Sequence, residues 1–253
     1  MRNFYLVCNW KMFPKNKQEL LNFWKKIEKI LTLPQKSRVV LCPPFVYLDF
    51  IPQQLFKINS PYLFLGAQDS FWKNFGPFTG EISPEMLKSF NVSFVILNHS
   101  ERITFKGETY EMSRWKIENA INCGLKSIVC LGEFKKGKFK KEISFQFDIL
   151  FSEKYYSPQN LILVWEPVWA ISTNLKGRRT IKKEETENII SFLKQKCQTY
   201  FKRDDYLIFY GGSVKPYNIE KIIASGFDGV LIGSSSISPK DLRQIVKIAE
   251  SVL

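Results

Sequence analysis

Residues 161–174 read LILVWEPVWAISTN, an unbroken apolar run that leads into Glu166 and then a proline. A run that is apolar at every position is typical of a strand covered on both faces, as in a parallel sheet. An apolar setting penalises a charged carboxylate and raises its basicity, which suits an acid that takes up a proton. Pro167 favours extended backbone at Glu166. We therefore expect Glu166 to end a buried strand and to act as a base there, not to form a structural ion pair.

Strand-like runs of this kind recur along the chain and alternate with amphipathic stretches. The predicted strands are 4–10, 37–43, 62–68, 92–100, 126–133, 160–167, 205–213 and 227–235. Three helices are clear between them, at 18–31 with an apolar face that includes Leu21, at 108–124 with Gly124 as a C-cap, and at 182–197.

Eight strand–helix units without a linker predict an α/β chain that forms a single (βα)8 barrel domain over residues 1–253. A doubly wound open sheet is the alternative architecture. Such a sheet would carry a GxGxxG turn after the first strand, and NWKMFPKN at 9–16 has none.

The composition excludes several classes of protein. The chain has 253 residues, no apolar run of membrane-spanning length, and an N-terminus too polar for a signal peptide, so we expect a cytoplasmic protein. Five cysteines without a CxxC pair, and a single histidine, argue against a zinc site and for buried free thiols.

The formal net charge of +13 permits three readings: nucleic-acid binding, attraction of an anionic substrate, or a lysine-rich proteome. Basic residues are dispersed, with local clusters at 134–142 and 177–183, and neither cluster interleaves with a nucleic-acid motif. We favour a composition bias with some attraction of anions, and expect no nucleic-acid partner and no membrane partner.

Polar residues follow the predicted strands where chemistry gathers in a barrel, at the carboxyl ends. They are Asn9, Lys11, Gln68, Asn98, His99, Glu133, Glu166, Ser213 and the 233–236 turn. A base, a possible acid, a cation and turn amides would share one mouth, which predicts a reaction site for a small anion.

Short motifs carry a specific resemblance. NWK (9–11), AQ (67–68), FTGE (78–81), HSER (99–102), CLGE (130–133), EPVWAIST (166–173), YGGSV (210–214) and VLIGSS (230–235) occur in the order and spacing of the triosephosphate isomerase family. The resemblance covers essentially the whole chain. It implies a homodimeric isomerase of glycolysis and gluconeogenesis, without cofactor or metal, that interconverts dihydroxyacetone phosphate and D-glyceraldehyde 3-phosphate through an enediolate.

The resemblance also implies catalytic roles. Glu166 would be the base, and His99 the neutral electrophile and acid, held neutral at a helix N-terminus as is known for this family. A lone histidine is more often structural, but a strand end followed by the helix start SER favours the catalytic role. Lys11 would stabilise the developing charge, with Asn9 as a nearby donor.

Supporting roles follow in the same way. Glu101 would pair with Lys11 and hold it in position. Segment 167–174 would be a mobile lid, and Glu133 would hold its Trp169 in the open state.

The phosphate site has no Walker pattern. Backbone amides at Ser213, Gly233 and Ser234 would bind the phosphate, joined by the amide of Ser172 when the lid closes. Tyr210, with Ser213, would latch the lid. Small residues in tight turns are the plain alternative, but two such turns on successive strands beside a base favour phosphate.

The loop at 69–81 is unusually long and aromatic. In the family it enters a pocket of the neighbouring subunit, which implies a homodimer through this loop. Alternatively it folds over its own barrel, and Phe71, Trp72 and Phe75 would then be an exposed aggregation risk.

The chain departs from the family pattern at several points. Asn98 and Ser234 replace glycines, Ile103 an arginine and Asn74 a common threonine, while the lid hinge at 172–180 is altered. A serine at 234 would be strained if that turn needs positive φ. The catalytic set is intact, which argues against the two rivals: a binding or structural barrel with reduced turnover, and a nucleic-acid-associated protein.

Overall fold

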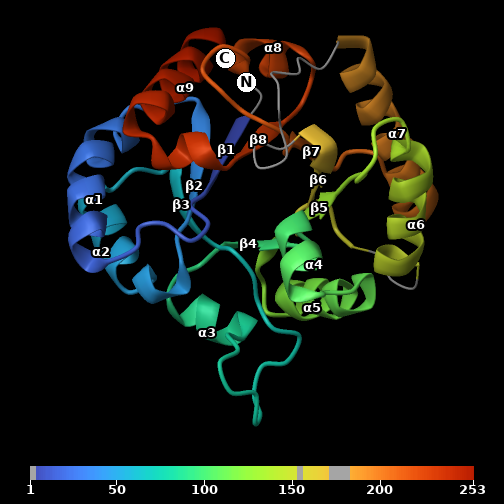
Figure 1. Ribbon diagram of the computed structural model, residues 1–253, viewed down its shortest axis with the longest axis horizontal. Coiled ribbons are helices and arrows are strands. Elements are labelled where there is room, and N and C mark those ends of the chain that lie inside the picture. The colour runs from blue at the N-terminus through green and yellow to red at the C-terminus, as the bar shows by residue number, and fades with distance from the viewer. Residues whose placement is uncertain (1–3, 153–155, 171–182) are drawn as a thin grey trace.

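The computed structural model describes residues 4–152, 156–170 and 183–253. Within them eight parallel strands pair in chain order, and the eighth pairs with the first to close a barrel (Figure 1). The strands are β1 (Phe4–Asn9), β2 (Ser37–Cys42), β3 (Leu63–Ala67), β4 (Phe94–Leu97), β5 (Lys126–Leu131), β6 (Leu161–Trp165), β7 (Leu207–Tyr210) and β8 (Gly229–Ile232). The predicted (βα)8 barrel is confirmed, with every strand somewhat shorter than predicted.

Helices surround the barrel and cover its outer face (Figure 1). The α-helices are α1 (Lys17–Leu31), α2 (Phe50–Ile58), α3 (Pro84–Ser89), α4 (Ser100–Lys106), α5 (Tyr110–Asn122), α6 (Phe139–Phe151), α7 (Lys183–Phe201), α8 (Ile219–Ala224) and α9 (Pro239–Val252). Short 3₁₀ helices are η1 (Phe45–Tyr47), η2 (Val168–Ala170) and η3 (Ser234–Ile237). None of the helices described here is long and apolar enough to span a membrane.

The continuous apolar runs have a simple structural reason. Along β6, Leu163 and Trp165 face the helices, while Ile162 and Val164 belong to a separate cluster that fills the barrel interior. Successive side chains of a strand point to opposite faces, and both faces are buried here. Continued by one residue, the same alternation brings Glu166 to the inner face, at the mouth of the barrel.

Two helix predictions need correction. Leu20 and Phe23 are buried on α1, whereas Leu21 is only half-buried, because Leu20 and not Leu21 completes the i, i+4, i+7 stripe with Trp24 and Ile27. Helix α7 continues past Cys197 to Phe201, which is fully buried in the outer core.

The expected helix end at Gly124 is present. Helix α5 stops at Asn122, and Gly124 takes a left-handed conformation with φ of 77°, as is common just after a helix C-cap.

The cysteines are free thiols, as expected, but not all are buried. Cys8, Cys42, Cys130 and Cys197 are buried, whereas Cys123 is half-buried, with its Sγ 3.3 Å from Asn74 Oδ1. Burial raises the pKa of the Cys8 thiol to about 12.

Candidate active site

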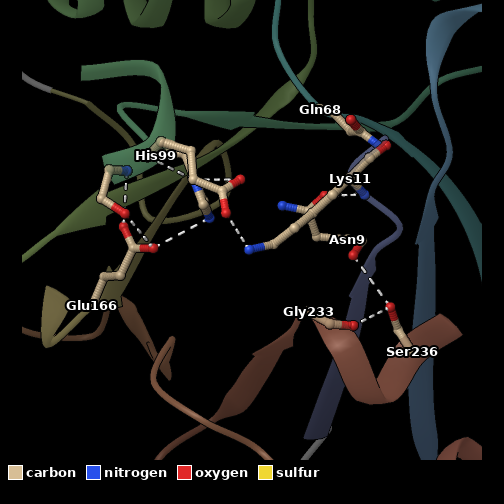
Figure 2. Close-up of polar contacts among 9 residues, drawn as sticks. Asn9, Lys11, Gln68, His99, Glu166, Gly233 and Ser236 are labelled. Carbon is tan, nitrogen blue, oxygen red and sulfur yellow. Dashed lines mark hydrogen bonds and ion pairs between the residues drawn. The ribbon is translucent and has the colours of Figure 1, made fainter. Parts of the chain in front are cut away.

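Glu166 lies buried at the mouth of the barrel, with 2% of its surface exposed. Its Oε2 accepts a hydrogen bond from the Ser100 amide at 3.1 Å, and its Oε1 accepts one from the Ser100 hydroxyl at 3.0 Å (Figure 2). Oε1 also lies 3.2 Å from His99 Nε2. The expectation of a buried strand end is met, but an apolar setting is not, because α4 begins here and supplies hydrogen-bond donors to the carboxylate.

His99 caps the N-terminus of α4. Its Nδ1 accepts a hydrogen bond from the Glu101 amide at 3.2 Å. A ring nitrogen that accepts a hydrogen bond carries no hydrogen, so the neutral ring has its hydrogen on Nε2. His99 Nε2 faces the Glu166 carboxylate (Figure 2).

Lys11 has an unusual backbone conformation just after β1, with φ of 53°. Left-handed backbone costs an ordinary residue about 1–2 kcal/mol. Two side chains hold it: Asn9 Oδ1 accepts from the Lys11 amide at 3.0 Å, and Gln68 Nε2 donates to the Lys11 carbonyl at 2.9 Å. Gln68 also donates to the Cys42 carbonyl at 2.9 Å. The conformation directs the Lys11 side chain across the mouth (Figure 2).

The Lys11 ammonium reaches Glu101 and forms an ion pair with its Oε1, the pairing that the family resemblance implies. Gly233 lies beneath the Lys11 side chain, where an added Cβ would come 3.3 Å from Lys11 Cε. A glycine therefore leaves room for Lys11 to extend toward His99 and Glu101.

Replacing Gln68 with alanine is expected to lower kcat/KM for the predicted isomerisation about tenfold. The Lys11 carbonyl then loses its hydrogen-bond donor, and the strained backbone of Lys11 can relax. Steady-state kinetics and thermal unfolding measure the effect. Gln18→Ala, on the exposed face of α1, is the matched control. A folded Gln68→Ala variant with unchanged kcat/KM would show that this clamp has no part in placing Lys11.

The predicted residues converge on one pocket, whose empty space is about 420 Å³ including its open mouth. It is lined by Asn9, Lys11, His99, Glu166, Gly211, Gly212, Ser213, Val214, Leu231, Gly233 and Ser234. The four predicted catalytic residues thus face the predicted phosphate turns in one pocket. Ser172, also predicted to bind phosphate, lies outside the described residues, as does the lid from residue 171 onward.

Glu133 is buried just after β5 and binds two indoles. Its Oε1 accepts from Trp169 Nε1 at 2.8 Å and its Oε2 from Trp165 Nε1 at 3.1 Å. Burial raises the pKa of the Glu133 carboxyl, against the opposing effect of these hydrogen bonds. The ammonium of Lys136 lies 5.2 Å from the Trp169 ring centre. The contact expected between Glu133 and Trp169 is therefore present.

Tyr210 ends β7 and is buried, with its ring against Trp165 and Phe227. Burial raises the pKa of its phenol. The lid residues that it is predicted to latch lie outside the described part of the chain.

Two departures from the family pattern now have a physical reading. Asn98 has φ of 57°, a conformation that asparagine tolerates better than most residues and that suits the family's glycine. Its Nδ2 donates to the Cys130 carbonyl at 2.6 Å. Ser234 does not belong to the positive-φ residues of the described chain; it opens η3 after Gly233, which has φ of −87°. The backbone strain considered for Ser234 is therefore not present.

Sequence reasoning assigned no role to three residues that brace the site. Ser100 donates to Glu166, and Ser236 Oγ contacts the carbonyls of Asn9 at 3.2 Å and Gly233 at 2.7 Å. The Gln146 side chain holds the Gly132 backbone, because its Nε2 donates a hydrogen bond to the Gly132 carbonyl at 2.6 Å. For Ser100 a signal was available, because the motif HSER places a hydroxyl at the first helical position beside His99. Ser236 belongs to the 233–236 turn that the sequence places at the mouth, whereas nothing in the sequence pointed to Gln146.

A closed barrel whose mouth holds a buried carboxylate, an imidazole and an ammonium defines a barrel enzyme of the acid–base type. The sequence model described as triosephosphate isomerase matches residues 4–249. The chain belongs to the triosephosphate isomerase family.

Named relatives agree with this assignment. Triosephosphate isomerases from Trichodesmium erythraeum and Dictyoglomus thermophilum are 36% and 34% identical, over 97% and 98% of this chain and 99% and 100% of theirs. The crystal structure of triosephosphate isomerase from Bartonella henselae matches with a TM-score of 0.82 at 26% identity, over 99% of this chain and 100% of that one.

Proposed function

We propose that Glu166 is the base in the interconversion of dihydroxyacetone phosphate and D-glyceraldehyde 3-phosphate, the reaction that family membership assigns to this enzyme. Glu166 takes the proton from the carbon beside the substrate carbonyl, and His99 donates its Nε2 hydrogen bond to the carbonyl oxygen. The resulting enediolate then takes a proton on the neighbouring carbon, while the proton of the neighbouring hydroxyl passes to the former carbonyl oxygen with His99 as the proposed acid between the two oxygens. The 3.2 Å approach of His99 Nε2 to Glu166 Oε1 in a shared pocket carries this proposal.

Substrate binding must exchange hydrogen-bond partners at this point. Without substrate, the hydrogen on His99 Nε2 faces Glu166. When substrate binds, this hydrogen would instead form a hydrogen bond to the substrate carbonyl oxygen. The carboxylate would then lose a donor inside a buried pocket, and a buried carboxylate with fewer donors is a stronger base. The hydrogen bonds that Glu166 accepts here therefore belong to the enzyme without substrate, and substrate binding would make Glu166 the stronger base.

Lys11 supplies the positive charge for this chemistry. Its side chain extends past Gly233 to Glu101. In this position the ammonium would lie close to the negative charges of both the enediolate and the phosphate. Preorganised charge in a site with little water stabilises a developing anion strongly. In our proposal Glu101 fixes the ammonium in position, and Asn9 fixes the backbone of Lys11.

The phosphate would bind opposite Glu166, at the turns after β7 and β8. Ser213, Gly233 and Ser234 line that side of the pocket, and their backbone amides are the proposed donors. Closure of the lid, with the Ser172 amide joining the phosphate, is proposed on the family resemblance alone.

A coupled assay with D-glyceraldehyde 3-phosphate tests the function. We expect rapid turnover without added cofactor, and competitive inhibition by a phosphoglycolate-type anion that mimics the enediolate phosphate. A folded protein that binds the inhibitor but forms no product would favour the binding-barrel alternative.

We propose that the chain forms a homodimer through the loop at 69–81. Figure 1 shows this loop projecting from the barrel between β3 and α3. Phe71 is buried at its base, contrary to the expectation for an unpartnered loop, because its ring packs against Phe78. Phe75 at the tip is 95% exposed. An apolar tip held away from its own barrel fits insertion into a second copy.

Replacing Phe75 with aspartate is expected to raise the dimer dissociation constant at least about tenfold, because a buried aromatic anchor often contributes more than 2 kcal/mol. Sedimentation velocity at micromolar concentration measures the shift. Phe56→Asp is the matched control, since Phe56 is 84% exposed on α2. A wild-type protein that sediments only as monomers would overturn the dimer proposal.

We also propose that residues 1–253 work as one domain in the cytoplasm. Strands of one barrel come from residue 4 through residue 232, which leaves no separable unit among them. The family's place in glycolysis supports the location.

A further inference from the structure

Lys215 approaches the proposed phosphate side of the pocket. It follows β7 and Val214, and its Nζ donates to the Ser234 hydroxyl oxygen at 3.1 Å. Ser234 lines the pocket directly and stands where the family pattern has a glycine. The serine therefore adds a hydroxyl, and the lysine a charge beside it, at the turn that is proposed to bind phosphate.

The direction of this hydrogen bond leaves one hydrogen available. An ammonium has only donors, so Ser234 Oγ must be the acceptor. The hydroxyl's own hydrogen has no acceptor among the described residues, and Ser234 is exposed at the mouth. A ligand oxygen in the pocket could accept that hydrogen, and the adjacent ammonium would polarise the hydroxyl toward it.

The nearby acid does not cancel the charge of Lys215. Asp241 Oδ2 lies 3.9 Å from Lys215 Nζ and also contacts the Ser235 hydroxyl at 3.5 Å. Both charged side chains are about a quarter exposed, at 27% and 29%. A loose, solvated pair of this kind holds an ammonium near the turn while leaving it free to attract a dianion.

We propose that Ser234 and Lys215 form an additional phosphate-binding pair that favours dianionic phosphate esters. The Ser234 hydroxyl donates to a phosphate oxygen while accepting from Lys215. The inference rests on the proposed placement of the phosphate beside Ser213, Gly233 and Ser234. It assigns the pair to substrate binding, and no part in the proton transfer.

Two substrates separate this role from a structural one. We expect Lys215→Met and Ser234→Gly each to lower kcat/KM for D-glyceraldehyde 3-phosphate about tenfold, a size typical of one charge-assisted hydrogen bond at a partly exposed site. In Lys215→Met the slow turnover of D-glyceraldehyde, which has no phosphate, should stay unchanged. The inhibition constant of inorganic phosphate should rise by the same factor.

Controls make the result decisive. Lys221→Met on α8 makes the same charge change on an exposed lysine and should leave both substrates unaffected. Ser234→Thr keeps a hydroxyl and should restore most of the activity, and the double variant should lose little more than either single one. Equal losses of kcat/KM with both substrates, or no loss with either, would overturn the proposal that Ser234 and Lys215 bind phosphate. Wild-type protein without turnover of the phosphorylated substrate would instead overturn the function proposed above.

Discussion

Replacing Glu166 with glutamine should lower kcat by about three orders of magnitude, within the range that a positioned general base contributes. The amide keeps the shape of the side chain and one acceptor for Ser100, but it cannot take a proton from carbon. The coupled assay measures the loss. Glu166→Ala should lose at least as much, because the base is then absent altogether.

Ligand binding distinguishes lost chemistry from a lost pocket. A phosphoglycolate-type inhibitor should still bind Glu166→Gln within about tenfold of wild type, since the proposed phosphate contacts come from other strands. If the glutamine variant kept most of its kcat, Glu166 would not be the base.

Replacing Lys11 with methionine is expected to lower kcat/KM by about two to three orders of magnitude, similar to the loss of a preorganised oxyanion donor. Two effects add in this variant. The ammonium that faces the enediolate and phosphate is gone, and Glu101 is left with a negative charge at the mouth that repels an anionic substrate.

A double variant separates these two effects. Glu101→Gln in the Lys11→Met background removes the uncompensated charge and should recover part of the substrate affinity, seen in KM, but little of kcat. Steady-state kinetics of the two single variants and the double variant complete the cycle. Recovery of kcat in the double variant would mean that Lys11 acts only by neutralising Glu101.

The sequence predicted the fold because both faces of each strand are buried. Residues such as Ile162 and Leu163 are apolar on opposite faces, and that pattern is readable without coordinates. It also predicted which residues gather at the mouth, because in a barrel all carboxyl strand ends meet there. Glu166 and His99 lie within hydrogen-bond distance for this reason.

The orientation of individual side chains could not be predicted in this way. Hydrophobic periodicity says nothing about the left-handed backbone of Lys11, which depends on Asn9 and on Gln68 from another strand. The pairing of Lys215 with Ser234 likewise joins two turns that are far apart in sequence. The apolar setting predicted for Glu166 was wrong because the N-terminus of α4 supplies hydrogen-bond donors to the carboxylate. The sequence around Glu166 does not reveal these donors, since they come from another part of the chain.

Isomerisation of D-glyceraldehyde 3-phosphate in D₂O tests the central claim most directly. If a carboxylate carries the hydrogen between carbons, it can exchange that hydrogen with solvent, and proton NMR should find deuterium on carbon 1 of the dihydroxyacetone phosphate formed. Glu166→Gln should form neither product nor labelled substrate at a comparable rate. A folded Glu166→Gln variant that still placed solvent deuterium on carbon 1 at the wild-type rate would contradict a base at Glu166.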